Sequence, residues 1–320
     1  MKKILAIILT ITILLSAFLV TSCSTTNRKE VFTIGICQFV QHAALDQATQ
    51  GFIDALKAEL GEENVVFDVQ NASGDTNVCN TIAVDFASKN VDLILANATP
   101  ALQAAYNATT SIPILGTSIT EYGVALGINN FNGTVGGNVS GTSDLAPLDK
   151  QADMILEICP DVKTVGIVYC TAEANSKYQV DVMTELLENK GITVTKFGFS
   201  DSNDLTAVVT AACTLSDALY VPTDNTAASC AETIGAIVRE YKVPLFAGEE
   251  NTAKGCGIAS LTINYYYLGV VTGKMAAKIL KGEADISTMP IEYADATKKY
   301  NKEMCKFFGI TVPEDYEAIK

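Results

Sequence analysis

VFTIGIC, at residues 31–37, is a short run of β-branched and apolar side chains, and a helical pattern follows it. In residues 43–60 apolar side chains recur at the three- and four-residue spacing of an amphipathic helix. Further strands are expected at 64–69, 92–96 and 112–115, and further helices at 76–89 and 100–107. Short strands that alternate with helices predict a parallel sheet covered by helices on both faces.

The same pattern occurs a second time. TVGI at 164–167 repeats TIGI at 33–36, and KVPLF at 242–246 repeats SIPIL at 111–115, each 131 residues later. The intervening sequence predicts helices and strands in the same order: helices at 175–189, 203–215 and 226–241, and strands at 191–196 and 217–221. We therefore expect an α/β protein with two similar Rossmann-like lobes in tandem.

The boundaries of these lobes follow from composition. We expect lobe 1 at residues 31–144 and lobe 2 at 145–285, with a helix at 148–158 opening lobe 2 and a long helix at 265–281 near its end. Residues 123–144 are rich in Gly, Asn, Ser and Thr, which is typical of a hinge segment. Residues 286–320 are expected to return toward lobe 1.

The N-terminus has the features of a bacterial lipoprotein signal. Lys2 and Lys3 precede an apolar run at 4–20, and VTSC at 20–23 places small residues before a cysteine. A transmembrane helix is the alternative, but a run of about seventeen residues is short for a bilayer span. We predict a signal peptide at 1–22, lipidation of Cys23 and a polar tether at 23–30.

Composition excludes several classes of partner and site. The net charge of −14 disfavours binding to nucleic acid and to anionic lipid headgroups. Eight cysteines remain besides Cys23, with no Cys-x-x-Cys pair and no Cys/His cluster, so no metal site is expected. Whether these cysteines form disulfides is left open. The eight are Cys37, Cys79, Cys159, Cys170, Cys213, Cys230, Cys256 and Cys305.

Motifs of catalysis and cofactor binding are missing from the sequence. It contains no Gly-x-Gly-x-x-Gly after a strand, no Walker A loop and no Gly-x-Ser-x-Gly elbow. His42 is its single histidine and has no evident nucleophile beside it. We therefore expect neither an enzyme nor a bound cofactor.

Several motifs are shared with a known family. They are QHAALD at 41–46 with QGF at 50–52, QNASGD at 70–75, ATPALQ at 98–103, GNVSGTSD at 137–144, EANS at 173–176 with Gln179, PTDN at 222–225, and YYYLG at 265–269 with GKMA at 273–276. In this order the chain resembles, over nearly all of its length after the signal, the ABC-transporter substrate-binding proteins whose characterised members include lipoproteins that bind tryptophan and other aromatic amino acids. One departure is Ala43, where the family usually has proline after the histidine.

The resemblance implies a periplasmic-binding-protein-like fold with the ligand between the lobes. In open α/β sheets ligands bind beyond the carboxyl ends of the strands, and four of the shared motifs follow expected strands: those at His42, at Thr99, at 173–176 and at 223–225. The full predicted set of ligand-binding residues is Gln41, His42, Leu45, Ala98, Thr99, Pro100, Thr117, Ser118, Ser143, Glu173, Asn175, Ser176, Gln179, Thr223, Asp224, Asn225 and Glu249.

Each of these residues also has a purely structural interpretation. Thr99 before Pro100 has the form of a helix N-cap, whose free amides can hold a carboxylate. Asn175 and Ser176 can cap the next helix, and Thr117-Ser118 can be an ordinary polar turn. Asp224 can pair with a ligand ammonium, because a buried carboxylate needs a cation, or it can cap the helix after it. Tyr122 and Tyr265 can frame a flat apolar side chain, or they can belong to the core.

The predicted function is capture of a small solute by closure of the two lobes, with an aromatic α-amino acid favoured by the resemblance. Other solutes are the alternatives: an aliphatic amino acid, a nucleoside or an aromatic acid. A sensory ligand-binding module is the alternative from another class. The resemblance implies an ABC permease and ATPase as partners, a monomer, and a position outside the cytoplasm with the lipid on Cys23 in the membrane.

Overall fold

The computed structural model describes residues 31–320, and residues 32–320 form one compact unit. The predicted signal peptide, Cys23 and the tether lie outside the described residues. Within the described part, no helix is long and apolar enough to cross a membrane.

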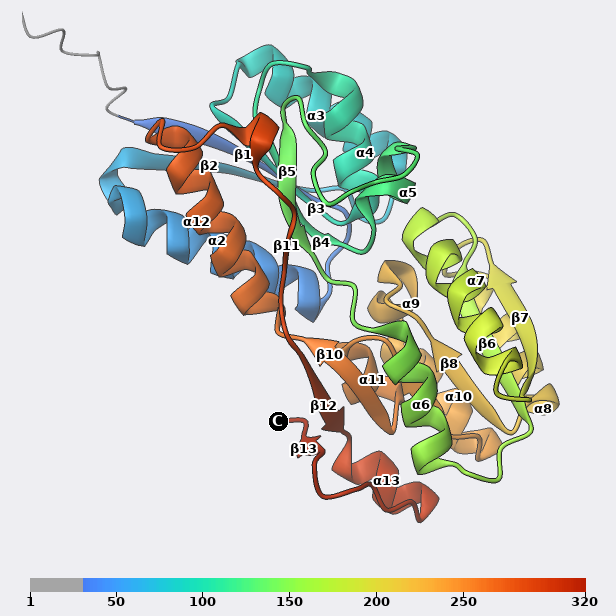
Figure 1. The fold of residues 1–320 in the computed structure, drawn as a ribbon. Helices are drawn as coiled ribbons and strands as arrows, with labels where there is room; N and C mark the ends of the chain where they lie inside the picture. Colours follow the sequence, from blue (N-terminus) through green and yellow to red (C-terminus); the bar gives the residue numbers. More distant parts are fainter. Residues whose placement is uncertain (1–30) are drawn as a thin grey trace, which may run out of the picture. The chain divides into compact units, whose positions relative to one another are not determined.

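Lobe 1 is built on a six-stranded parallel sheet in the order β11-β5-β4-β3-β1-β2. Its strands are β1 (Phe32–Gln38), β2 (Val65–Asn71), β3 (Leu93–Asn97), β4 (Ile114–Ile119), β5 (Val139–Ser143) and β11 (Glu292–Tyr293). Its helices are α2 (Ala43–Leu60), α3 (Thr76–Lys89), α4 (Thr99–Ala108) and α5 (Tyr122–Leu126), with a short turn η1 (Glu62–Asn64). Figure 1 shows α3 and α4 on one face of this sheet and α2 on the other.

Lobe 2 contains a seven-stranded sheet in the order β13-β12-β10-β9-β8-β6-β7. Its strands are β6 (Thr164–Cys170), β7 (Thr193–Phe199), β8 (Ala218–Val221), β9 (Leu245–Ala247), β10 (Ala259–Ile263), β12 (Ala296–Tyr300) and β13 (Glu317–Ala318). Its helices are α6 (Leu148–Ile158), α7 (Ala174–Glu188), α8 (Leu205–Leu215), α9 (Asn225–Ser229), α10 (Ala231–Tyr241), α11 (Glu250–Cys256) and α13 (Lys302–Phe308). The order β2-β1-β3-β4 in lobe 1 recurs as β7-β6-β8-β9 in lobe 2, which confirms the predicted pair of similar lobes.

The glycine of the repeated motif has a packing role in both lobes. Gly35 in β1 lies under Phe86, and a Cβ atom at Gly35 would be 2.7 Å from the phenyl ring. Gly166 in β6 is equally confined, because a Cβ there would be 2.5 Å from Ser216 Oγ. Glycine at the centre of each first strand therefore lets a helix or loop approach the sheet closely.

The helix α12 (Tyr265–Leu280) differs from its predicted place. It was expected in lobe 2, but it packs along α2 and contributes Met275 and Ala276 to the core on that face of the lobe 1 sheet. The two backbones touch at glycines: a Cβ at Gly51 would lie 2.1 Å from Tyr266 O, and one at Gly269 would lie 2.0 Å from Ala48 O. Only glycine permits this approach, so the contact between the two helices requires these small residues.

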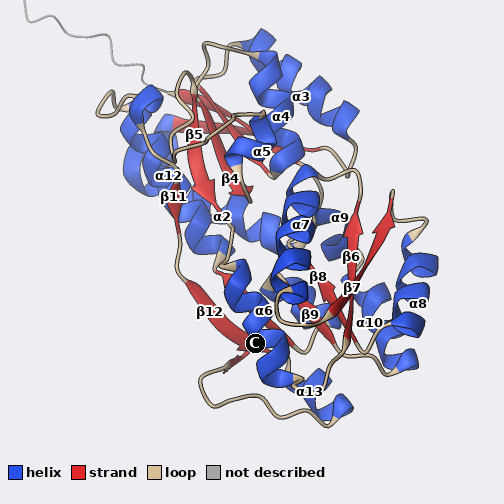
Figure 2. Cartoon of the chain, turned by 45° about the vertical axis from the view of Figure 1, so that its right-hand side comes forward, coloured by secondary structure: helices blue, strands red, loops and turns tan. Residues whose placement is uncertain are grey.

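The predicted course of the last residues is also corrected. Of residues 286–320, the turn η2 (Ile286–Thr288) and strand β11 lie with lobe 1, where β11 pairs with β5. Strands β12 and β13 and helix α13 lie with lobe 2, because β12 pairs antiparallel with β10 and β13 pairs with β12. Figure 2 shows β12 and α13 at the same end of the molecule as α6. The predicted hinge at 123–144 contains most of α5 and all of β5, both parts of lobe 1, and the chain crosses to lobe 2 only after Ser143.

We predict that Gly269→Ala destabilises the protein. The added methyl group would meet the carbonyl oxygen of Ala48, and relief requires the two helices to move apart. Overpacking of this kind costs about 1–3 kcal/mol. Urea unfolding should show a lower midpoint, whereas Lys274→Ala, on the exposed face of α12, should stay within about 0.5 kcal/mol of the wild type. A midpoint for Gly269→Ala equal to that of the wild type would contradict the close contact.

Candidate functional site

Two residues at the carboxyl ends of neighbouring strands in lobe 1 have a strained backbone. Ala98, after β3, has φ 89°, and Ser118, near the end of β4, has φ 57°. The two segments are tied together, since Ala98 N donates to Thr117 O at 3.1 Å. Side chains with a Cβ rarely adopt such angles, and residues that do so cluster at ligand clamps and active sites. The strain therefore marks this edge of the sheet as the candidate site.

The polar groups at this edge include two free hydroxyls, which can donate hydrogen bonds. Ala98, not Thr99 as expected, is the N-cap residue of the ten-residue helix α4, and no side chain caps the helix. Thr99 Oγ1 and Ser118 Oγ are buried, and neither has a hydrogen-bond partner. Two free hydroxyl groups beside the start of a helix are suited to a carboxylate.

Lobe 2 presents acceptors at the corresponding edge. Asp224 is 1% exposed and caps α9, with Ala227 N donating to Oδ1 at 2.8 Å and Cys170 N donating to Oδ2 at 2.6 Å. Burial, followed by the nearby Glu173 carboxylate, raises its pKa to about 7. Asp224 therefore has the capping role considered for it. In the described part of the chain, no ion pair gives its carboxylate a cationic partner.

Glu173 is buried in the same part of lobe 2 and accepts hydrogen bonds from three residues. Its Oε2 accepts from Asn225 N at 3.1 Å, Asn225 Nδ2 at 2.6 Å and Asn175 Nδ2 at 3.2 Å. Its Oε1 accepts from Thr226 N at 2.9 Å and Thr226 Oγ1 at 2.8 Å. Glu173 therefore holds the loop after β8 against the start of α7.

The side chains of α7 complete this arrangement. The Gln179 side chain makes two hydrogen bonds to the backbone of Thr223: it accepts from the N–H at 3.0 Å and donates to the carbonyl oxygen at 2.9 Å. Asn175 donates to the same carbonyl at 3.1 Å, while Asn175 Oδ1 is buried without a partner. Ser176 is fully buried and hydrogen-bonds to Asp224. Gln179 and Ser176 thus shape the loop, and Asn175 retains a free acceptor.

His42 connects the two lobes. Its Nε2 lies 3.3 Å from Asn225 Oδ1, and its Nδ1 is buried without a partner. Seven buried side-chain polar atoms of the described residues lack a partner, and four of them belong to predicted site residues: His42, Thr99, Ser118 and Asn175. This concentration at one set of strand ends is what a polar ligand site requires, because buried polar groups are normally satisfied.

Cavities lie on the interface between the lobes. One of about 390 Å³ contains Pro100 and Glu173 from the predicted set, and another of about 440 Å³ contains Gln41 and His42. The first is also lined by residues that the sequence analysis did not select: Phe39, Val40, Ser73, Gly74, Asp75, Thr76, Cys170, Ala172, Ser200, Asp201, Ser202, Asn203, Thr226 and Ser229. Many of these follow β1, β2 and β7, so inspection of the second strand end of each lobe would have found them.

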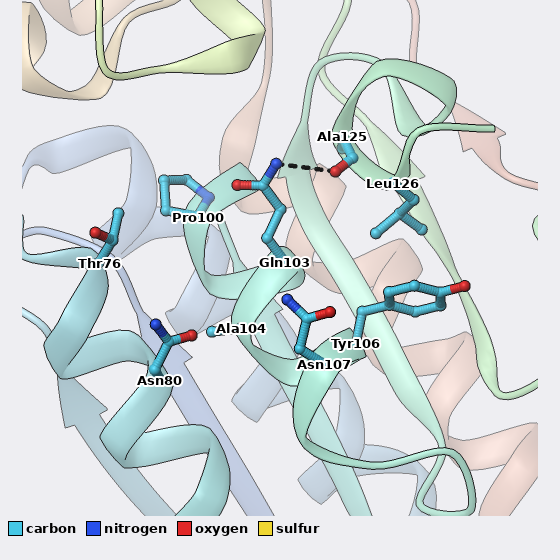
Figure 3. A pocket seen from close by; sticks show the side chains of 9 residues that line it. All are labelled: Thr76, Asn80, Pro100, Gln103, Ala104, Tyr106, Asn107, Ala125 and Leu126. Carbon is cyan, nitrogen blue, oxygen red and sulfur yellow. Dashed lines mark hydrogen bonds between the residues drawn. The ribbon is translucent and has the colours of Figure 1, made fainter. Parts of the chain in front are cut away.

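A further cavity of about 340 Å³ lies within lobe 1 alone, among α3, α4 and the end of α5 (Figure 3). Gln103 crosses it to donate from Nε2 to Ala125 O at 2.9 Å. It shares Pro100 and Thr76 with the interface cavity of about 390 Å³, but no residue of lobe 2 lines it. Closure of the lobes would not enclose a ligand there.

The other predicted residues have structural contacts. Leu45 and Ala98 belong to the core of lobe 1, and Thr117 accepts from Thr142 Oγ1 at 3.3 Å. Ser143 Oγ donates to Thr120 O at 2.9 Å, and Glu249 caps α11 through the backbone amide of Asn251 at 2.7 Å and that of Thr252. Tyr122 OH donates to Thr142 O at 3.0 Å inside lobe 1, so it does not frame the cleft.

Asp144 is buried where the chain first leaves lobe 1. Tyr265 OH, at the start of α12, donates to its Oδ2 at 2.8 Å, and Thr120 Oγ1 donates to Oδ1 at 3.1 Å. Burial raises the pKa of Asp144 to about 6, and the nearby Glu249 carboxylate adds to this increase. Both neighbouring donors are neutral hydroxyls. Tyr265 therefore belongs to the connection between the lobes.

The sequence matches a known family of proteins. A family model described as ABC transporter substrate binding protein matches residues 33–318. The chain belongs to this family. This membership confirms the predicted function of an ABC-transporter solute-binding protein.

Three relatives are informative. The tyrosine-binding protein of Clostridioides difficile (strain R20291) is 37% identical over 275 residues, covering 85% of this chain and 79% of the relative. The ABC domain in complex with L-Trp from Streptococcus pneumonia is 34% identical with a TM-score of 0.85, covering 89% and 96% of the two chains. A ligand-free, open structure of a substrate-binding protein from Clostridium difficile is 39% identical with a TM-score of 0.69, covering 91% and 99%.

We predict that Asp144→Asn makes stability less dependent on pH in this substrate-binding protein. The raised pKa means that the fold favours protonated Asp144, so its stabilising contribution is complete below the ordinary pKa of 3.8 and is lost as pH rises through about 6. Asparagine is neutral at every pH and keeps both hydroxyl partners. The variant should equal the wild type near pH 4 and be more stable by about 1–3 kcal/mol at pH 8.

Urea unfolding of both proteins between pH 4 and pH 8 measures this difference. Asp149→Asn is the matched control, because Asp149 is exposed on α6. Parallel pH profiles for the wild type and Asp144→Asn would contradict the assignment of a raised pKa to Asp144.

Proposed function

We propose that this substrate-binding protein captures an aromatic α-amino acid between its lobes and delivers it unchanged to an ABC permease. The observation that carries the proposal is the opposite polarity of the two edges. Lobe 1 offers unpartnered donors at Thr99 and Ser118, and lobe 2 offers acceptors at Asp224 and Asn175. A zwitterion with its carboxylate toward lobe 1 and its ammonium toward lobe 2 satisfies both.

The charges of the site favour this orientation. None of the seventeen predicted residues is Lys or Arg, so the carboxylate is held by hydroxyl groups and the amides at the start of α4. The Asp224 carboxylate, whose pKa burial raises to about 7, gains a cation when the ammonium arrives. A ligand with only one of the two charges would leave one edge unsatisfied.

The aromatic side chain is supported by the relatives. One is named for tyrosine and another is complexed with L-Trp, at 37% and 34% identity. The TM-score is higher for the L-Trp complex than for the ligand-free, open relative, although the latter is more similar in sequence. The present structure is thus more similar to the relative with a bound ligand than to the open one. This order of the TM-scores supports closure of the lobes around a ligand as the binding movement.

The Asp224→Asn variant tests the zwitterion. Loss of one partner of a desolvated charge pair costs about 2–5 kcal/mol, or roughly 30- to several-thousand-fold in affinity. A thermal-shift screen of the common amino acids identifies the best ligand, and calorimetry then compares the two proteins. Tryptophan binding can also be followed by its fluorescence, because the chain has no tryptophan. Binding by the variant within about threefold of the wild type would leave Asp224 as a helix cap only.

Delivery without reaction has its own test. After prolonged incubation with the protein, mass spectrometry should recover the amino acid from the screen chemically unchanged. Conversion in proportion to protein concentration would overturn the receptor assignment and indicate an enzyme.

The proposed position is outside the cytoplasm, with the monomer anchored by a lipid on Cys23. VTSC at 20–23 supports this, because the cysteine follows small residues at the end of an apolar run. Cys23→Ser should abolish labelling by radioactive palmitate and leave the precursor unprocessed, whereas Cys159→Ser should be labelled normally. Persistent labelling of Cys23→Ser would contradict the anchor.

A further inference from the structure

The direction of each hydrogen bond from Glu173 to His42 can be assigned. The backbone N–H groups of Asn225 and Thr226 can only donate, so the Glu173 carboxylate is the acceptor in this cluster. At 2.6 Å from Glu173 Oε2, the side-chain atom of Asn225 must be Nδ2 and not the oxygen. The orientation of the Asn225 amide, which is ambiguous in an isolated side chain, is fixed by Glu173.

This orientation determines the proton on His42. With Nδ2 turned to Glu173, Asn225 presents Oδ1 to the imidazole of His42 at 3.3 Å. An amide oxygen only accepts, so His42 Nε2 carries the hydrogen. In the neutral ring Nδ1 is then an acceptor, and this atom is buried without a partner.

An acceptor on lobe 1 has a specific use. Under the proposed function, the hydroxyls of Thr99 and Ser118 meet the carboxylate, and the acceptors of lobe 2 meet the ammonium. His42 Nδ1 is the remaining unpartnered atom among the predicted site residues. A hydrogen-bond donor on the ligand side chain would satisfy it. Phenol O–H and indole N–H are such donors, and the phenyl ring of phenylalanine has none.

We propose that Glu173, acting through Asn225, holds His42 in the Nε2–H tautomer, and that His42 Nδ1 selects amino acids whose aromatic ring carries a hydrogen-bond donor. Glu173 and Asn225 are positioning residues, and His42 determines specificity. The selectivity rests on the proposed function; the tautomer rests on the contact of His42 with Asn225, which requires the two lobes to lie as close together as they do here.

The tautomer can be observed by NMR with the lobes closed by an amino acid from the thermal-shift screen whose side chain has no hydrogen-bond donor, because the contact of His42 with Asn225 joins the two lobes. His42 is the only histidine in the sequence, so ring-¹⁵N-histidine labelling gives one pair of imidazole resonances. At pH 8.5, where an ordinary imidazole is neutral, the wild type should show a protonated Nε2 and an unprotonated Nδ1. Glu173→Gln, in which the new amide can also donate, should give the averaged signals of mixed tautomers. Mixed tautomers in the wild type, or an unchanged spectrum in Glu173→Gln, would overturn the relay.

Selectivity is tested with L-tyrosine, L-tryptophan and L-phenylalanine. An unpaired buried acceptor costs about 5- to 150-fold in affinity, so L-phenylalanine should bind the wild type more weakly by a factor in this range. L-tyrosine or L-tryptophan should shift the Nδ1 resonance, and L-phenylalanine should not. His42→Gln keeps an N–H near the position of Nε2 and removes the Nδ1 acceptor, so it should bind the three amino acids within about twofold of one another.

Controls separate this result from misfolding. The His42 side chain makes no capping bond to α2, so His42→Gln should melt near the wild-type temperature, and Gln47→Ala, exposed on the same helix, should keep the wild-type preference. A wild type that binds L-phenylalanine as well as L-tyrosine, or a His42→Gln variant that keeps the preference, would overturn the specificity role. A wild type that binds none of the three would refute the proposed ligand, while the tautomer measurement would still decide the relay.

Discussion

The connection between the lobes depends on the contact between α2 and α12, two helices that are more than two hundred residues apart in the sequence. Glycines at the contact bring the backbones together, and α12 thereby joins lobe 1 directly after strand β10 of lobe 2. The chain must then cross again to place β12 beside β10. Tyr265 lies at the first residue of α12, and its hydroxyl reaches Asp144 on the earlier crossing. The contact between α2 and α12 therefore determines where the chain crossing at Asp144 meets the chain crossing at Tyr265.

The two lobes share a topology but differ in the chemistry of their strand ends. In lobe 1 the ends of β3 and β4 carry strained residues and free hydroxyls. In lobe 2 the ends of β6 and β8 carry two buried carboxylates, whose contacts are with neutral donors of their own lobe. A duplicated fold has thus acquired free hydroxyls on one side and buried carboxylates on the other. Because of that asymmetry, two similar lobes can recognise a ligand that carries a carboxylate on one side and an ammonium group on the other.

The fold was largely predictable from the sequence because its signals are local. The repeated TIGI and TVGI segments and the alternation of strands and helices specify two mainly parallel sheets, and the candidate site follows from the strand ends. The place of α12 was not predictable, because a glycine on a helix does not name the helix that it will contact. The return of β12 and α13 to lobe 2 was missed for a similar reason: the pairing of β10 with β12 joins residues distant in sequence. At the candidate site, residue types indicated which side chains to consider, but they did not indicate the role of each side chain. Glu173 and Asp224 are both acidic residues after strands, yet only their contacts show that one holds a loop and the other caps a helix.

The backbone at Ala98 has a thermodynamic consequence for recognition. An alanine with φ 89° is held there by its surroundings, since an unconstrained chain would leave this conformation. The amides that follow it are consequently ordered before any solute arrives. Association then loses little backbone entropy at this edge, and more of the interaction energy is retained as affinity. The steric penalty is met once, during folding, rather than in each round of capture and release.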